Sequence, residues 1–218
     1  KTLEEELEAS SGVRVERIAA DLSQREAPAA LEAAVGELGI ELEALVNNAG
    51  LGTYGPFVDN DLEEEMMEID VNVRALTELT KRFLPGMVRR GRGRILNVAS
   101  TAAFQPGPGM AVYFATKAYV LSLSEAVAYE LRGTGVTVTA LCPGGTSSEF
   151  HARADMEHSR FVRPEKWPTS EEVARYGYRA MMRGIPVAIH GTANRVGAWS
   201  VRLFPRRWVT ALTAKVMS

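Results

Sequence analysis

Short apolar runs alternate with longer stretches of helical periodicity along most of the chain, and this alternation constrains the fold more than any other feature. Five runs have the length and composition of strands: residues 13–21, 42–47, 94–100, 136–142 and 186–190. Helices are predicted at residues 22–38, 60–90, 110–131 and 171–183. Strands that alternate with helices of a dozen residues or more form βαβ units around a parallel sheet. The sequence therefore predicts an α/β protein with one doubly wound parallel sheet.

Capping and breaking residues refine the ends of these helices. Ser23 is the expected N-cap of the helix over residues 22–38, and Asn60 or Asp61 is the expected start of the helix that reaches residue 90. Pro85 lies in the last turns of that helix and is expected to kink or break them, because proline lacks a backbone N–H.

Composition is that of an ordinary globular protein. Apolar residues make up 46% and charged residues 24% of the 218 residues, which excludes a disordered tail, a collagen-like repeat and a coiled coil. No apolar run approaches 18 residues, and the first residues hold no secretory signal. The single cysteine, Cys142, excludes a disulfide framework and suits a reducing compartment. We expect a cytoplasmic protein, and no metal site, because the histidines lack metal-ligand spacing.

Charge is unevenly distributed along the chain. The net charge of −2 argues against nucleic acid as a partner, yet residues 173–218 carry 8 basic residues and no acidic residue. In residues 195–218, tryptophans and leucines lie among basic residues, and Pro205 interrupts the helical pattern. We expect this basic amphipathic tail to pack on its own domain, residues 1–194, or on a second subunit. Peripheral contact with an anionic membrane surface is the alternative.

Polar or glycine-containing turns follow four of the predicted strands. They are residues 21–23, 47–50, 100–101 and 143–148. Ligands of doubly wound folds bind beyond the carboxyl ends of the strands. A binding crevice is therefore expected at this edge of the sheet.

Three residues near this edge have the chemistry of a proton-transfer site. Tyr113 and Lys117 lie four residues apart at the start of a predicted helix, so their side chains share one face. A tyrosine, with a pKa of about 10, is a poor acid or base at neutral pH unless a nearby ammonium stabilises its phenolate. Ser100 ends a strand thirteen residues before Tyr113, and its hydroxyl could hold a substrate oxygen beside the phenol. Each residue alone has an ordinary structural explanation, but the combination is specific.

The order of these motifs resembles the short-chain dehydrogenase/reductase family. The resemblance runs from about residue 13 to residue 150 and rests on Asn47-Asn48-Ala49-Gly50, Ser100, Tyr113-x-x-x-Lys117 and Pro143-Gly144. It implies a Rossmann-like fold, a homo-oligomer (dimer or tetramer) and a catalytic tetrad. The positions that match the tetrad are Asn72, Ser100, Tyr113 and Lys117.

The resemblance also implies a role for each member of this tetrad. Tyr113 would be the general acid/base, and Ser100 would hydrogen-bond the carbonyl or alcohol oxygen. Lys117 would lower the pKa of Tyr113 and hold the hydroxyls of the nicotinamide ribose. Asn72 would anchor a water that links Lys117 to solvent.

A cofactor site for NADP, with NAD as the alternative, follows from the same resemblance. Besides Tyr113 and Lys117, the matching positions are Asp21 and Leu22 beside the adenine, Asn48, Ala49 and Gly50 along its ribose, and Pro143, Gly144, Thr146 and Ser148 at the nicotinamide and phosphates. The segment from about residue 150 to residue 168 matches the family's variable substrate lid. An apolar substrate is suggested there by Phe150, Met156, Phe161 and Trp167.

One part of the family pattern is missing from the sequence. The glycine-rich fingerprint after the family's first strand does not occur, and the family layout would place roughly 40–50 residues before residue 1. We therefore expect the sequence to be part of a longer chain. Residues 50–55 spell G-x-G-x-x-G, but Pro56 follows at once and no helix is predicted to begin there. We interpret them as a flexible loop beside the substrate mouth.

These inferences favour an NAD(P)-dependent oxidoreductase that interconverts a carbonyl and an alcohol on a rather apolar small molecule. The alternative is a non-catalytic protein of the same fold that senses dinucleotides or associates with membranes, and the complete tetrad argues against it. Ester hydrolysis by Ser100 would require a G-x-S-x-G elbow and a placed histidine, and the sequence has neither.

Overall fold

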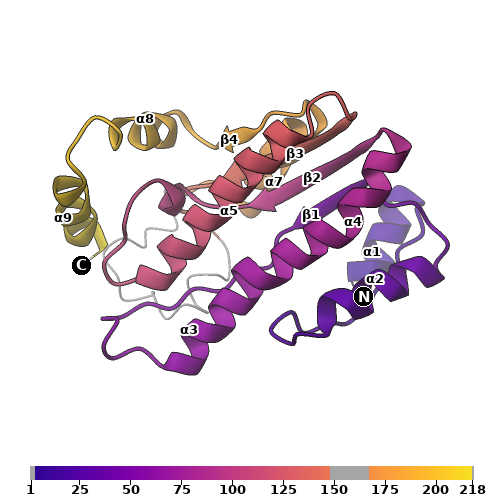
Figure 1. Cartoon of the computed structure of the whole chain (residues 1–218), viewed down its shortest axis with the longest axis horizontal. Helices are drawn as coiled ribbons and strands as arrows, with labels where there is room; N and C mark the ends of the chain where they lie inside the picture. The colour runs from indigo at the N-terminus through magenta and orange to yellow at the C-terminus, as the bar shows by residue number, and fades with distance from the viewer. Residues whose placement is uncertain (1–2, 148–166, 218) are drawn as a thin grey trace.

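The computed structural model describes residues 3–147 and 167–217, and its described strands form one parallel sheet. The strands are β1 (Ala44–Asn47), β2 (Gly93–Val98), β3 (Val136–Cys142) and β4 (Val187–Ile189). They lie side by side in the order β1-β2-β3-β4, each parallel to its neighbour (Figure 1). The predicted α/β class is confirmed, and the observed strands follow four of the five predicted runs.

Helices cover both faces of this sheet. The helical segments are α1 (Leu3–Ser11), α2 (Ala27–Glu37), α3 (Leu62–Ile69), a π-helix (Asp70–Ala75), α4 (Leu76–Arg90), a 3₁₀ helix (Thr101–Phe104), α5 (Ala111–Glu130), α7 (Ser170–Met182), α8 (Thr192–Ser200) and α9 (Arg206–Met217). Alternate residues of β3 face different helices: Ala140 and Cys142 pack in a cluster with Val120 of α5, whereas Leu141 packs with Val173 of α7. Because side chains alternate across a strand, α5 and α7 lie on opposite faces of the sheet.

The predicted strand over residues 13–21 is wrong. Residues 12–21 have no regular secondary structure, and Val13 is 56% exposed. Among the described residues, β1 pairs only with β2, so no ladder is present to satisfy the backbone groups of this segment. The alternating pattern was correct as a local signal, but a strand also needs a neighbour.

The start of the second helix also differs from the prediction. Ser23 does not cap a helix, because its N–H and hydroxyl both donate to Asp21 Oδ1 in a turn. Helix α2 begins later, at Ala27, with Pro28 in its first turn. Proline suits that position because the first N–H groups of a helix have no partner within it.

One long helical stretch carries residues 62–90, as predicted. The side chain of Asp61 accepts hydrogen bonds from the N–H groups of Glu63 and Glu64 and so caps its start. Pro85 lies inside α4 without ending it, and the helix stops at Gly91, whose φ of 66° is left-handed. The π-helix between α3 and α4 was not predicted.

A chain of buried polar side chains ties the sheet to its helices. Asn47 Nδ2, at the end of β1, donates to Asn97 Oδ1 on β2 at 2.8 Å and to Thr80 Oγ1 on α4 at 3.1 Å. Asn97 Nδ2 donates to Ser124 Oγ on α5 at 2.9 Å. These bonds fix β1, β2, α4 and α5 relative to one another beneath the carboxyl edge of the sheet.

The C-terminal helices fold back over that edge (Figure 1). Pro205 separates α8 from α9, and α8 begins at Thr192, so the predicted domain boundary after residue 194 lies inside a helix. Met217 is buried in a cluster with Met110 and Phe114, and its carbonyl accepts a hydrogen bond from Tyr54 Oη at 2.9 Å. The tail therefore packs on its own domain. In the part of the chain that the structure describes, no helix is long and apolar enough to cross a membrane.

Two glycines in the turn before β3 provide a matched test of how closely this turn packs on its neighbours. Gly133 and Gly135 both have positive φ, 81° and 78°. A Cβ on Gly135 would lie 1.9 Å from the Gly91 carbonyl oxygen, whereas a Cβ on Gly133 would meet nothing within 4 Å. We expect Gly133→Ala to lower the free energy of unfolding by about 1–2 kcal/mol through strain alone. Gly135→Ala should cost about 2 kcal/mol more, because backbone must shift. Denaturant unfolding of both variants measures this, and equal losses would contradict the packing described.

Candidate active site

A large cavity opens at the carboxyl edge of the sheet, where the predicted crevice lies. Its volume is about 1240 Å³. Three of the four predicted tetrad residues line it: Ser100 lies two residues after the end of β2, and Tyr113 and Lys117 lie in the first turns of α5. The strand ends and the helix start therefore bring these three side chains to one wall.

Ser100 and Tyr113 are joined by a hydrogen bond between their side chains. Ser100 Oγ also accepts from the Ala102 N–H at 3.1 Å and so caps the 3₁₀ helix that follows β2. The pKa of Tyr113 is raised to about 12, chiefly by burial; the hydrogen bond to Ser100 opposes this, and the charge of Glu68 adds to it. The phenol is therefore protonated at neutral pH. The expected lowering of its pKa by Lys117 is not seen, because burial dominates.

Lys117 is almost completely buried, with 4% of its surface exposed. Its Nζ donates to the Val98 carbonyl at 2.9 Å and lies 5.6 Å from the centre of the Tyr113 ring. Burial lowers the pKa of Lys117 to about 8, while the charge of Glu68 acts in the opposite direction. Cys142 also acts on Lys117, but burial raises the pKa of that thiol to about 12, so it is neutral.

Asn72 lies behind the cavity wall, in the π-helix. Its side chain clamps the loop after β1: Oδ1 accepts from the Leu51 N–H, and Nδ2 donates to the Leu51 carbonyl, both at 2.9 Å. Nδ2 also donates to Thr116 Oγ1 at 3.0 Å. A Cβ on Gly50 would lie 3.3 Å from both Asn72 Oδ1 and Lys117 Nζ, which explains the glycine at this position. The amide thus positions the loop beside Lys117.

Glu68 is a member of this site that the sequence analysis missed. It is fully buried on α3, and its Oε2 accepts from the Thr53 N–H at 3.1 Å and from Thr53 Oγ1 at 3.0 Å. Burial raises its pKa to about 7, against the smaller opposing effects of Thr53 and Lys117. The acidic pattern of residues 63–65 gave no hint of this, because such runs usually form a solvated helix face.

Most of the predicted cofactor residues line the same cavity. These are Asn48, Ala49, Gly50, Pro143, Gly144 and Thr146, in addition to Tyr113 and Lys117. At Gly50 backbone rather than a side chain lies beside Lys117 Nζ, so no Cβ stands between a ligand in the cavity and the ammonium. The residues present therefore fit a dinucleotide. Ser148 lies outside the described residues.

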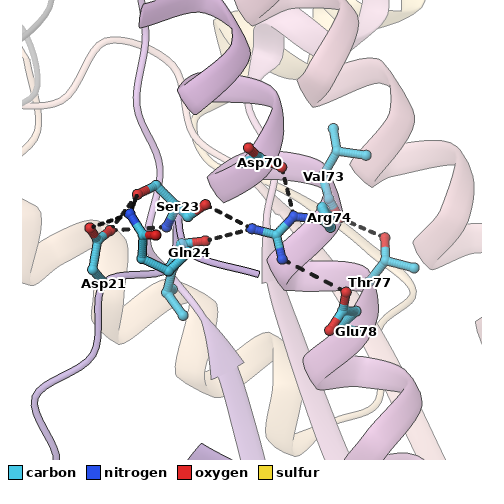
Figure 2. A network of polar contacts seen from close by, with 9 residues as sticks. Asp21, Ser23, Gln24, Asp70, Val73, Arg74, Thr77 and Glu78 are labelled. Carbon is cyan, nitrogen blue, oxygen red and sulfur yellow. Dashed lines mark hydrogen bonds and ion pairs between the residues drawn. The ribbon is translucent and has the colours of Figure 1, made fainter. Parts of the chain in front are cut away.

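Asp21 and Leu22 do not line the cavity. Figure 2 shows why they are held where they are: the Arg74 guanidinium, which pairs with Asp70, reaches back to the carbonyls of the 21–24 turn. Arg74 Nη2 donates to the Ser23 carbonyl at 3.0 Å and to the Leu22 carbonyl at 3.4 Å. Hydrogen bonds from Ser23 lower the pKa of the exposed Asp21 carboxyl. Arg74 thus anchors the turn over residues 21–24 against the π-helix that also carries Asn72.

Part of the cavity wall comes from the C-terminal helices, a placement that the sequence did not predict. Its apolar residues are Val201, Phe204, Trp208, Val209, Leu212, Val216 and Met217. Met110 and Phe114, at the start of α5, line the same cavity and pack in one cluster with Met217. Of the predicted lid, only residues 167 and 168 are described, and residues 150–166 lie outside the described part of the chain. A Cβ on Gly145 would fall 2.4 Å from Trp167 Cε2, so Trp167 packs directly on the strand-end loop.

The loop over residues 50–55 does not open a helix, as predicted, and its predicted flexibility stays a prediction. No helix begins at its glycines, since α3 starts only at Leu62. Gly50 and Gly52 line the cavity. Within the described residues, no group of three or more histidine, cysteine or acidic side chains could hold a metal ion.

The burial of Glu68 predicts a pH-dependent stability. Its pKa is about 7 in the folded protein and near 4.5 in the unfolded chain, so the two states differ only above pH 4.5. As pH rises from 4.5 to 7, the unfolded state loses its proton first, and the folded protein is destabilised by roughly 3 kcal/mol. Glu68→Gln removes this loss. Its melting temperature should exceed that of the wild type at pH 8, and the difference should shrink toward pH 4.5. Glu64→Gln, on the exposed face of α3, is the control, and a constant difference for Glu68→Gln would contradict the assignment.

Comparison with known proteins identifies this arrangement. The family model described as short chain dehydrogenase matches residues 1–158. The uncharacterized oxidoreductase YvrD of Bacillus subtilis (strain 168) is 33% identical in an alignment that spans 93% of this chain and 84% of the relative.

Solved structures give the same result. A short-chain dehydrogenase from Sphingobium yanoikuyae in complex with NADPH superposes with a TM-score of 0.80 at 33% identity, over 92% of this chain and 78% of that chain. The bulky-bulky ketone specific alcohol dehydrogenase from Comamonas testosteroni has a TM-score of 0.75 at 27% identity, over 92% and 76%. With the sheet, the cavity and the Tyr113–Lys117 pair already in place, these matches show that the chain belongs to the short-chain dehydrogenase/reductase family of NAD(P)-dependent oxidoreductases.

Proposed function

We propose that this protein interconverts a ketone and an alcohol with NADP as cofactor, and that Tyr113 is its general acid/base. The observation that carries this proposal is that Ser100, Tyr113 and Lys117 lie together on one wall of a cavity. That cavity is large enough for a dinucleotide and a substrate. The alternative of a non-catalytic sensor is less well supported, because a binding protein has no need of a phenol hydrogen-bonded to a serine and backed by a buried lysine.

The geometry suits proton transfer to a carbonyl oxygen. When bound, the dinucleotide supplies the hydride to the carbonyl carbon. Tyr113 is protonated at neutral pH and so is ready to donate its proton to the oxygen. Ser100, which already hydrogen-bonds Tyr113, is placed to donate a hydrogen bond to the same oxygen and to stabilise the negative charge that develops on it. For alcohol oxidation Tyr113 must lose its proton, and the ammonium of Lys117 is the charge that favours that loss.

NADP is the proposed cofactor. The Sphingobium yanoikuyae neighbour was solved with NADPH. In this chain, we assign the nicotinamide end to Pro143, Gly144 and Thr146, and the ribose to Lys117 and the backbone of residues 48–50. Ser148 and the predicted adenine contacts, Asp21 and Leu22, remain part of the proposal.

A ketone with a bulky apolar substituent is the proposed substrate. Phe204, Trp208 and Leu212 of the C-terminal segment and Phe114 of α5 form an apolar wall in the cavity that Tyr113 also lines. Such a wall buries apolar surface and offers few hydrogen-bond partners. The name of the Comamonas testosteroni neighbour describes a ketone with bulky groups on both sides, which fits this wall.

The partners and location follow the family pattern in this proposal. We assign a homo-oligomer, a cytoplasmic location and one catalytic domain over residues 1–194. A second candidate role for residues 195–218 is contact with an anionic membrane surface. It is favoured by Trp199 and Leu203, which are largely exposed beside Arg202.

Replacement of Tyr113 tests the proposed acid/base directly. Tyr113→Phe removes only the hydroxyl, so we expect turnover of a ketone with NADPH to fall by about 10²–10⁴-fold or more. Binding of NADPH, followed by the fluorescence of the reduced nicotinamide, should stay within about threefold of wild type. Retained turnover would refute the assignment of Tyr113.

Replacement of Trp208 tests the proposed substrate wall. Trp208→Ala enlarges the cavity and leaves Ser100, Tyr113 and Lys117 in place, so KM for a bulky aryl ketone should rise about tenfold while kcat for acetone changes little. Trp199→Ala is the matched control, because Trp199 is exposed and does not line the cavity. Equal effects of the two variants on the bulky ketone would exclude Trp208 from the substrate site.

A further inference from the structure

Glu68 is a buried acid to which the proposed reaction assigns no role. It lies on α3, four residues before Asn72, and none of its surface is exposed. Only one of its carboxyl oxygens is held: Oε2 accepts both hydrogen bonds from Thr53. Oε1 has no hydrogen-bond partner among the described residues. A buried polar atom without a partner is uncommon in native proteins and points to a function.

The charged groups around Glu68 come from two elements. On its own helix, Glu65 is buried and accepts from Asn60 Nδ2 at 3.0 Å. On α5, the charge of Lys117 lowers the pKa of Glu68, and the charge of Glu68 raises the pKa values of Lys117 and Tyr113. The loop after β1 contributes only the neutral Thr53. Lys117 is thus the positive group, among the residues that the structure describes, whose charge acts on the Glu68 carboxyl.

Lys117 needs a counter-charge that its own contacts do not provide. Its Nζ donates to a neutral carbonyl, that of Val98. The Cys142 thiol, which also faces it, is neutral at working pH. An ammonium removed from water is costly unless an opposite charge compensates it. Glu68 is the acid whose charge acts on Lys117, and it does so through space, because no ion pair joins the two side chains within the described residues.

A purely structural role would not require a carboxylate at this position. The two donors of Thr53 need one acceptor oxygen, which the amide of a glutamine would supply equally well. A glutamate at the same site carries the added cost of burying an acid. That cost is understandable if the charge acts on Lys117.

We propose that Glu68 is a positioning residue of the proton-transfer site: its buried carboxylate is the counter-charge that keeps Lys117 protonated, and Lys117 in turn lets Tyr113 exchange its proton. This inference rests on the function proposed above for Lys117 and Tyr113. It adds a fifth residue, reached through Lys117, to the four that the family resemblance suggested.

The direction of the pH effect follows from the signs of the charges. Lys117 loses its proton as pH rises through its pKa of about 8, and the charge of Glu68 raises that pKa. Glu68 itself is ionised above its pKa of about 7. Removing the carboxylate must therefore lower the pKa of Lys117, so that its charge is lost at a lower pH. The alkaline limb of kcat/KM should move in the same direction.

The test is a titration of Lys117 in the cofactor-free protein, paired with a pH profile of the enzyme. The ¹³Cε resonance of Lys117, assigned by its loss in Lys117→Arg, reports the ammonium directly and needs no turnover. In Glu68→Gln we expect the pKa of Lys117 to fall by about one pH unit, and the alkaline limb of kcat/KM with NADPH to move down by a similar amount. Glu65→Gln makes the same chemical change three residues earlier in α3. Because the charge of Glu65 raises the pKa of Glu68, this change favours the Glu68 carboxylate, and so it should neither lower the pKa of Lys117 nor move the alkaline limb down.

Other outcomes separate this inference from the proposed function. If the enzyme turns over ketones but Glu68→Gln leaves both the Lys117 titration and the pH profile unchanged, the inference is overturned and the proposed function stands. If no carbonyl is reduced, the titration still decides the inference on its own. If Glu68→Gln does not fold, Thr53→Val replaces it: loss of the hydroxyl raises the pKa of Glu68, so the pKa of Lys117 should fall by a smaller amount, and an unchanged value would overturn the inference.

Discussion

A buried ammonium is the constraint on which the rest of the site depends. Lys117 points into the protein because it lies one turn beyond Tyr113 on the buried side of α5, where its Nζ reaches the Val98 carbonyl at the end of β2. With only 4% of its surface exposed, it is poorly solvated there, so its charge depends on the carbonyl and on Glu68. Gly50 keeps its own side free of a Cβ that would crowd the ammonium. The same burial that makes the charge costly brings the pKa of Lys117 to about 8, where it can exchange protons near neutral pH.

Local signals were enough to predict the features of the fold that place this lysine. The run over residues 136–142 matches β3 residue for residue, and the i, i+4 spacing of Tyr113 and Lys117 was sufficient to put both side chains on one helix face. The strand predicted at residues 13–21 failed for a different reason. Alternation describes a segment's own side chains, whereas a strand exists only where a neighbour completes its backbone hydrogen bonds. Ser23 failed in a similar way, because its hydroxyl bonds Asp21 in a turn.

Long-range packing decided what could not be predicted. Glu68 belongs to an acidic helix that has the composition of a solvated face, and only the folding of Thr53 and α5 over it makes it buried. Trp208 and Met217 lie about a hundred residues after Tyr113 and meet its cavity only because α9 folds back and Tyr54 holds its end. The π-helix that carries Asn72 leaves no simple periodic signal, although such segments are frequent at functional sites.

Direct transfer of hydride is the event that the whole arrangement of Ser100, Tyr113 and Lys117 serves. The most direct measurement is therefore to incubate the protein with NADPH deuterated at C4 of the nicotinamide and a bulky apolar ketone, and to analyse the alcohol by mass spectrometry. The account predicts an alcohol that carries one deuterium on the carbinol carbon and is formed in equal amount to the oxidised cofactor. Cofactor binding without any deuterated alcohol, across a panel of ketones and for both prochiral positions of the label, would contradict it.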